Sequence, residues 1–274
     1  VLAERAYAPW TDMEAALREA DVPLYSLESK HPLADFDIVG ISLPYETLYT
    51  NALNILHLSR IPLMAAARGP EHPLVIAGGH ATYNPEPMHA FIDAFIIGEG
   101  EDAIMEVVDT HQAWKNENTP REVLLQLLSQ VPGVYVPSLY ESSYQPDGRF
   151  SCLERLHPSA PLPIVKRITP DLPPPLTDFI VPYIDIVHDR AAIEIMRGCT
   201  RGCRFCHAGI VNRPVRERPV EEVVNAIEAA VRATGFEEVG LLSLSSSDYT
   251  QIVELVEAIQ EKFEDRHLSI SLPS

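Results

Sequence analysis

The first half of the chain alternates short apolar runs with longer amphipathic stretches. The apolar runs predict buried strands at residues 37–43, 74–77 and 94–97. The clearest amphipathic stretch, residues 46–60, predicts a helix, and the spacing of Thr11 and Glu14 predicts a capping box that opens an earlier helix. Strands that alternate with helices in this way favour a parallel, doubly wound sheet of the α/β class.

A proline-rich segment interrupts this alternation in the middle of the chain. Eight prolines lie between residues 158 and 182, a density that excludes a helix or a central strand. We therefore expect an α/β domain at residues 1–137, an irregular linker at 138–182 and a second domain at 183–274.

The second domain repeats the strand–helix pattern. Strands are expected at residues 192–196, 238–244 and 268–272. A helix should start after Pro219 and end at Gly235, and another should cover residues 249–263. The resulting βαβαβ order places a cysteine-rich segment directly after the first strand.

Composition narrows the class of protein. The 274 residues are 46% hydrophobic and 22% charged, which is typical of a globular protein, and no apolar run approaches the roughly 18 residues that predict a membrane span. The net charge of −18 weighs against a large nucleic-acid surface but leaves a local one open. Three of the four cysteines fall within eight residues, which excludes a disulfide framework and favours metal ligation in a reducing compartment, the cytoplasm.

One stretch departs from the acidic balance. Between residues 190 and 218, seven arginines stand against two glutamates; the arginines are Arg190, Arg197, Arg201, Arg204, Arg213, Arg216 and Arg218. Such a stretch can mark an anionic ligand, or its arginines can pair with acidic helices nearby. The sequence leaves both interpretations open.

Cys199, Cys203 and Cys206 have C-x₃-C-x₂-C spacing on one short loop. Three thiolates so placed can hold three corners of a 4Fe–4S cluster, and Gly198 and Gly202 permit the tight turns that this requires. The fourth iron then lacks a protein ligand and is open for chemistry. The alternative is a zinc site completed by a histidine, although zinc loops usually come as two separated knuckles.

This cysteine motif, with the aromatic Phe205 before its last cysteine and a preceding strand that starts a βα series, resembles the radical S-adenosylmethionine superfamily. The resemblance implies that the open iron binds S-adenosylmethionine and that one electron cleaves it to methionine and a 5′-deoxyadenosyl radical. It places Phe205 near the adenine. Since only three strands are expected, the chain should contain the first half of a partial (βα) barrel.

The resemblance also implies that the loop after the next strand holds the amino group of S-adenosylmethionine. Small polar residues and a carboxylate occur there, as Ser245, Ser246, Ser247 and Asp248. The match to the usual motif is loose, and an ordinary turn capped by Ser and Asp is the alternative.

The N-terminal domain resembles the Rossmann- or flavodoxin-like cobalamin-binding domain that precedes the barrel in one class of radical enzymes. Ser42, Gly78 and Gly79 end two of its expected strands, where ligands of such sheets bind. Pro44 replaces an expected leucine and the lower-ligand motif is not found, so cobalamin remains an optional cofactor. The runs His188-Asp189-Arg190 and Arg213–Arg216 resemble a group of such fused proteins without an assigned substrate.

Three functions follow as hypotheses. The first is a radical S-adenosylmethionine enzyme with an unknown substrate, an anionic one being an option, and an electron donor such as flavodoxin or ferredoxin. The second is a cobalamin-dependent methyltransferase or methylthiotransferase that acts on RNA or protein. The third is a zinc-stabilised binding module that is not an enzyme.

Overall fold

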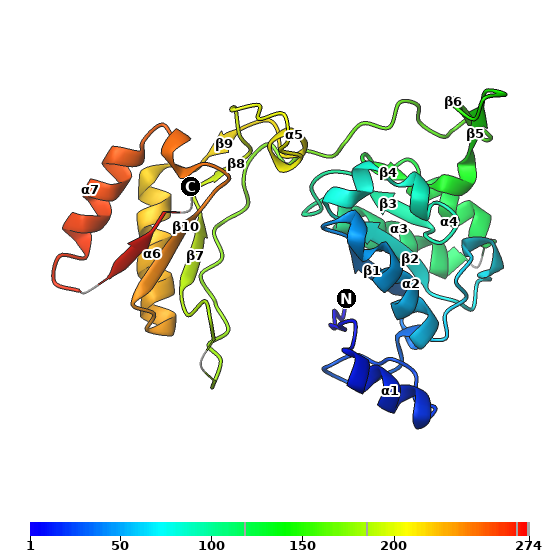
Figure 1. Ribbon diagram of the computed structural model, residues 1–274, viewed down its shortest axis with the longest axis horizontal. Coiled ribbons are helices and arrows are strands. Elements are labelled where there is room, and N and C mark those ends of the chain that lie inside the picture. The colour runs from blue at the N-terminus through cyan, green and yellow to red at the C-terminus, as the bar shows by residue number, and fades with distance from the viewer. Residues whose placement is uncertain (118, 185, 267, 273–274) are drawn as a thin grey trace. The chain divides into compact units, whose positions relative to one another are not determined.

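The computed structural model describes residues 1–117, 119–184, 186–266 and 268–272. Contacts divide the chain into two compact units, Val1–Ile168 and Thr169–Ser274, and each has a hydrophobic core of its own (Figure 1). No helix in these described ranges is long and apolar enough to cross a membrane.

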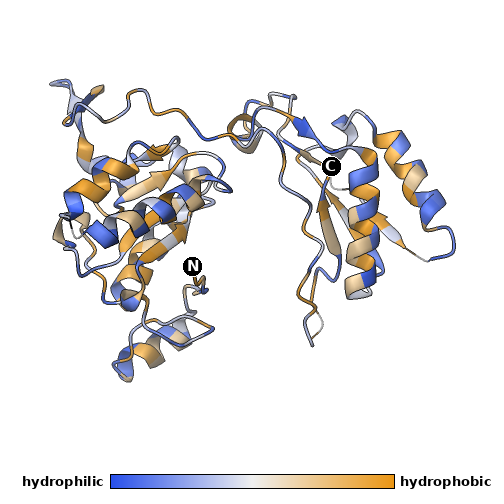
Figure 2. Ribbon diagram, turned by 180° about the vertical axis from the view of Figure 1, so that it is seen from behind, coloured by the Kyte–Doolittle hydropathy of each residue, from blue (hydrophilic) through white to orange (hydrophobic). Residues whose placement is uncertain are grey.

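The first unit is built on a four-stranded sheet with the order β1-β2-β3-β4. Its parallel part confirms the three predicted strands and consists of β1 (Ile38–Ser42), β2 (Leu74–Gly78) and β3 (Ala94–Ile96). In Figure 2 these strands are largely hydrophobic. Ser42 pairs with Gly78, and Gly78 with Ile96, so the carboxyl ends of the three strands lie in one row.

The fourth strand, β4 (Val134–Tyr135), runs antiparallel to β3. Two helices in succession, α3 (Ala103–Glu117) and α4 (Arg121–Leu128), connect β3 to β4. Two helices in succession can bring the chain back to the end of the sheet where β3 finishes, so that the next strand runs antiparallel to β3. A single crossover helix would instead give a parallel neighbour. The doubly wound prediction did not include this reversal.

The two N-terminal helices occur where the sequence predicts them, as α1 (Thr11–Glu19) and α2 (Tyr49–Leu58). The predicted capping box is wrong, because Trp10 is the N-cap residue and no side-chain cap bond forms. Glu14 instead accepts hydrogen bonds from Arg18 (2.8 Å) and Asn54 (2.8 Å).

An antiparallel hairpin of β5 (Tyr140–Tyr144) and β6 (Phe150–Arg155) lies inside the segment expected to be an irregular linker. The contacts assign it, and the chain up to Ile168, to the first unit. Arg167 is hydrogen-bonded to the segment that directly follows β3. Its amide donates to the carbonyl of Ile97 (2.8 Å), and its carbonyl accepts from the amide of Glu99 (3.1 Å).

The second unit contains a three-stranded parallel sheet with the order β11-β10-β7. Its strands are β7 (Ala191–Glu194), β10 (Glu238–Leu242) and β11 (Ser269–Ser271), and its main helices are α6 (Val220–Thr234) and α7 (Ile252–Lys262). The predicted βαβαβ order is confirmed. Gly235 ends α6 in the left-handed conformation, as its position in the sequence predicts.

Candidate cluster-binding site

The cysteine loop leaves the carboxyl end of the sheet and is closed at its base. After β7 the chain forms β8 (Met196–Arg197), which pairs antiparallel with β9 (Arg216–Glu217). Ile195 joins this base to the sheet, because its amide donates to the carbonyl of Leu242 (3.0 Å). The loop between β8 and β9 therefore stands at the edge where parallel sheets bind their ligands.

The three cysteines lie within eight residues of this loop and differ in exposure. Cys199 is buried, Cys206 is half-buried and Cys203 is exposed. The amide of Cys206 donates to the carbonyl of Cys203 (3.0 Å). Two further amides donate to sulfur: that of Arg201 to Cys199 Sγ (3.4 Å) and that of Gly209 to Cys206 Sγ (3.3 Å). Hydrogen bonds to sulfur are among the contacts that tune an iron–sulfur cluster.

Three cysteine thiols on one loop are a donor set that fits an iron–sulfur cluster. Among the described residues, no three His, Cys, Asp or Glu side chains converge so as to hold one metal ion. A cluster does not require such convergence, because each cysteine binds a different iron. Gly209 packs closely against two of the cysteines: it is buried, and a Cβ there would lie 3.4 Å from Cys206 Sγ and 4.0 Å from Cys199 Cβ.

The shape of the loop depends on Gly198, as the sequence predicts. This residue has φ +89°, and a Cβ would lie 2.7 Å from the carbonyl oxygen of Pro214 and 2.8 Å from that of Asn212. A side chain is therefore excluded both by backbone conformation and by space. Gly202 also has a positive φ, +67°, but its surroundings are more open.

Most of the basic stretch is engaged within the second unit. Ion pairs join Arg190 to Glu238 (2.8 Å), Arg197 to Glu194 (2.9 Å), Arg201 to Asp248 and Arg218 to Glu222 (2.6 Å). Arg216 donates to the carbonyl of Thr169 (2.6 Å), and Arg213 to that of Cys199 (3.4 Å). These contacts favour the interpretation that the arginines hold the loop and its base together. Arg204 is exposed beside Cys203.

The loop after β10 contains the residues expected to hold S-adenosylmethionine. Ser246 is buried, and its hydroxyl donates to the carbonyl of Leu241 (3.3 Å), while Ser245 is half-buried and Ser247 exposed. Asp248 accepts hydrogen bonds from the guanidinium of Arg201. These bonds, together with one from Ser245, hold the pKa of the Asp248 carboxyl below its usual range. The structure thus brings Asp248 to the cysteine loop.

Phe205 is 91% exposed on the cysteine loop. Contact of Phe205 and of residues 245–248 with S-adenosylmethionine stays a prediction.

Three residues that were not predicted from the sequence, Glu217, Tyr249 and Thr250, connect the loop after β10 to the base of the cysteine loop. The hydroxyl of Tyr249 donates to the carbonyl of Arg218 (2.7 Å), and burial raises the pKa of Tyr249 to about 12. The amide of Thr250 donates to Glu217 Oε1 (3.0 Å), and its hydroxyl donates to Oε2. The sequence contains no signal for these contacts, since their partners lie more than 30 residues apart.

In the first unit, Ser42, Gly78 and Gly79 lie at the carboxyl ends of β1 and β2, as expected. A Cβ at Gly79, where φ is +112°, would lie 2.7 Å from the carbonyl oxygen of Leu43, so the packing of the chain itself requires this glycine. A Cβ at Gly78 would meet nothing within 4 Å, which leaves room for a ligand.

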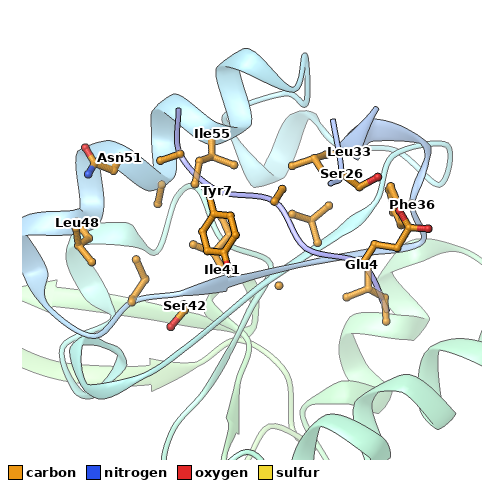
Figure 3. Close-up of a pocket in the computed structure, with 17 residues that line it drawn as sticks. Glu4, Tyr7, Ser26, Leu33, Phe36, Ile41, Ser42, Leu48, Asn51 and Ile55 are labelled. Atoms are coloured by element: carbon orange, nitrogen blue, oxygen red, sulfur yellow. The ribbon is translucent and has the colours of Figure 1, made fainter. Parts of the chain in front are cut away.

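Ser42 lines a pocket of about 410 Å³ along β1, together with Tyr7 and Asn51 (Figure 3). Gly78 and Gly79 do not line it. The pocket and the glycine pair therefore do not form one site, and cobalamin binding at these three residues stays a prediction.

Comparison with known families agrees with this architecture. Residues 1–137 match the family described as radical SAM proteins, N-terminal, and residues 193–274 match the radical SAM superfamily. The chain belongs to the radical SAM superfamily, whose members are enzymes that use a 4Fe–4S cluster and S-adenosylmethionine.

Among individual proteins, the chain is 28% identical to the uncharacterized protein MJ0966 of Methanocaldococcus jannaschii over 247 residues, which are 87% of this chain and 45% of that protein. The radical S-adenosylmethionine methyltransferase TsrM from Kitasatospora setae, solved with tryptophan substrate and a SAM analog, gives a TM-score of 0.51 at 13% identity, over 93% of this chain and 44% of TsrM. A TsrM structure with cobalamin and a [4Fe-4S] cluster gives 0.49 at 14% identity, over 93% and 45%.

The chain thus spans about half the length of these relatives. At 13% identity, the likeness to TsrM shows the fold, an α/β domain followed by part of a radical SAM barrel.

Proposed function

We propose that Cys199, Cys203 and Cys206 hold the 4Fe–4S cluster and that the protein cleaves S-adenosylmethionine to start radical chemistry on its substrate. The observation that carries this proposal is that three thiols lie on one loop, closed by β8 and β9, at the carboxyl ends of the strands in the unit that matches the radical SAM superfamily. When bound, the cluster supplies the electron for the cleavage.

The residues of the chain itself prepare the site. The β8–β9 ladder closes the loop, Gly198 allows its first turn, and the amides of Arg201 and Gly209 face two of the sulfurs. Such fixed donors need no reorganisation when a charged group binds, which is how protein dipoles stabilise charge efficiently. A reducing compartment such as the cytoplasm would keep the thiols free to bind iron.

Anaerobic reconstitution of the full-length protein with iron and sulfide, followed by dithionite and S-adenosylmethionine, tests the proposal. We expect bound iron and 5′-deoxyadenosine from the wild type, and neither from a variant with all three cysteines changed to alanine. Cys152→Ala is the matched control, because Cys152 is exposed on the β5–β6 hairpin of the other unit. A cluster-loaded wild type that releases no 5′-deoxyadenosine would contradict the proposed activity.

Methyl transfer with cobalamin is the second candidate. It is supported by the fold shared with TsrM, a radical S-adenosylmethionine methyltransferase, and by the open space at Gly78. Titration of the purified protein with cobalamin, followed by absorbance, tests it. If cobalamin binds over the strand ends, Gly78→Val should abolish binding without unfolding the sheet, because a valine side chain would point into open space.

The substrate and the electron donor are also proposals. An anionic substrate is supported mainly by the exposed Arg204, since most of the other arginines are engaged. An RNA substrate is weakly supported, because the chain carries a net charge of −18. A flavodoxin or ferredoxin is the proposed electron donor, and reduction of the cluster by either protein in place of dithionite would identify it.

A further inference from the structure

Arg201 and Asp248 form a two-point ion pair between the cysteine loop and the loop after β10. Arg201 Nε donates to Asp248 Oδ2 at 2.7 Å, and Nη2 donates to Oδ1. Parallel hydrogen bonds of this kind fix the orientation of the guanidinium as well as its distance. Both carboxylate oxygens are occupied, and the Asp248 side chain is only 17% exposed.

Arg201 lies between Cys199 and Cys203 in the sequence. Its backbone amide donates to Cys199 Sγ at 3.4 Å. Its guanidinium carries a positive charge, which the ion pair with Asp248 holds in place. A change in the position of Arg201 therefore changes both an N–H donor to sulfur and a positive charge beside the thiols.

The partner of Arg201 is itself firmly placed. Next to Asp248, Tyr249 is almost fully buried and donates to the carbonyl of Arg218, and Thr250 donates twice to Glu217. These contacts bind the loop after β10 to the base of the cysteine loop, at β9. Asp248 thus provides a fixed point against which the exposed part of the cysteine loop can be held.

We propose that Asp248 is a positioning residue, which holds Arg201 so that its amide stays directed at Cys199 Sγ and the loop keeps its cluster-binding shape. The inference rests on the proposed function, because it assumes a cluster on these cysteines. Direct contact of Asp248 with the amino group of S-adenosylmethionine is the competing assignment. The two assignments differ in one respect: positioning requires Arg201, whereas direct contact does not.

The test uses the reconstituted full-length protein and the variants Asp248→Asn, Arg201→Gln and the double variant. Iron release to an excess of chelator is timed, and S-adenosylmethionine binding is measured by calorimetry. We expect each single variant to release iron about two- to fivefold faster, the range of an ion pair at the surface with one exposed partner. The double variant should be no faster than the worse single variant. Arg190→Gln is the control, since it removes an ion pair of the same unit at the opposite, amino end of β7.

A redox titration followed by electron paramagnetic resonance gives a second measurement. Arg201→Gln should lower the midpoint potential, because a positive charge near the sulfurs favours the reduced cluster. Unchanged iron release in Arg201→Gln would overturn the inference. So would weaker S-adenosylmethionine binding in Asp248→Asn but not in Arg201→Gln, since it would assign Asp248 to the ligand. Failure of the proposed function is separate, because it shows as a wild type that binds no cluster.

Discussion

At Gly198 the backbone has φ +89°, and two carbonyl oxygens, of Asn212 and Pro214, lie where a side chain would begin. We expect Gly198→Ala to lower the iron bound per chain after reconstitution, because the alanine must push the two ends of the cysteine loop apart. Gly235→Ala is the matched control: it also has a positive φ, +77°, but its Cβ would meet nothing within 4 Å. Both variants carry a left-handed alanine, which costs about 1–2 kcal/mol. Equal iron binding in the two would contradict the role assigned to the carbonyl oxygens.

His111 is a buried histidine of the first unit that packs beside Trp114, with ring centroids 5.4 Å apart. Burial lowers its pKa, opposed by Asp37 and assisted by Lys115 and Arg121. The unfolded chain, with a histidine pKa of about 6.5, then binds a proton before the folded chain does, so stability falls as the pH drops below that value.

We expect His111→Gln to reduce this loss of stability between about pH 7 and about pH 5. Urea unfolding at both ends of this range, followed by tryptophan fluorescence, measures it. A pH dependence identical to that of the wild type would assign the acid sensitivity to other groups.

Sequence alone could predict that Cys199, Cys203 and Cys206 share one short loop and that Gly198 allows its turn, because spacing and turns are local. It could not predict that Arg201 and Asp248 pair, since they are 47 residues apart and meet only because β7 and β10 are neighbours. The sequence left open whether the basic stretch binds an anion or pairs with acidic residues of the chain. Two of its ion pairs, Arg197–Glu194 and Arg218–Glu222, are local, whereas Arg190–Glu238 joins distant positions. The acidic partners of its arginines come from β7, β10, α6 and the loop after β10.

At the scale of elements, a buried ionic network joins α4 to the strands of the first sheet. Asp93 precedes β3 and accepts hydrogen bonds from Arg68 (3.1 Å), Arg121 (2.9 Å) and the amide of Val75 (2.8 Å). The three charged side chains are at most 7% exposed. Six backbone carbonyls accept further hydrogen bonds from the two guanidinium groups, so the network holds α4 and the loop before β2 against the sheet.

We expect Asp93→Ala to destabilise the first unit by about 3–5 kcal/mol, because it leaves two buried guanidinium groups without their carboxylate. Glu28→Ala is the control: it removes an ion pair to Arg5 with 60% and 37% of the side chains exposed, and should change stability little. Chemical denaturation of both variants measures the difference. A small loss in Asp93→Ala would mean that the carbonyls alone satisfy the arginines.

Prediction at this scale succeeded where an element has a clear apolar run or an apolar periodicity. The strands at 38–42, 74–78 and 238–242 and the helix at 220–234 all have clear apolar patterns and were found. The strand β6 was missed because its side chains are exposed, apart from the half-buried Leu153, so no alternation marks it. The antiparallel direction of β4 was also missed, since it depends on how α3 and α4 pack.

At the scale of the whole molecule, the two units have separate cores. The first is formed by residues such as Leu56, Leu74 and Phe95, and the second by residues such as Ile193, Ile227 and Leu241. Domains with cores of their own are expected to unfold as separate cooperative units. Both tryptophans, Trp10 and Trp114, belong to the first unit, so their fluorescence reports its unfolding specifically.

A ligand that binds only the folded state stabilises the unit that holds it. Under the proposed function, removal of the cluster should therefore lower the unfolding midpoint of the second unit, seen by circular dichroism, and leave the tryptophan transition of the first unit unchanged. Asp93→Ala should do the reverse: it should lower the tryptophan midpoint and leave cluster retention as in the wild type. If instead one transition were seen by both probes, and cluster removal moved it as a whole, the two cores would have to be regarded as one cooperative unit.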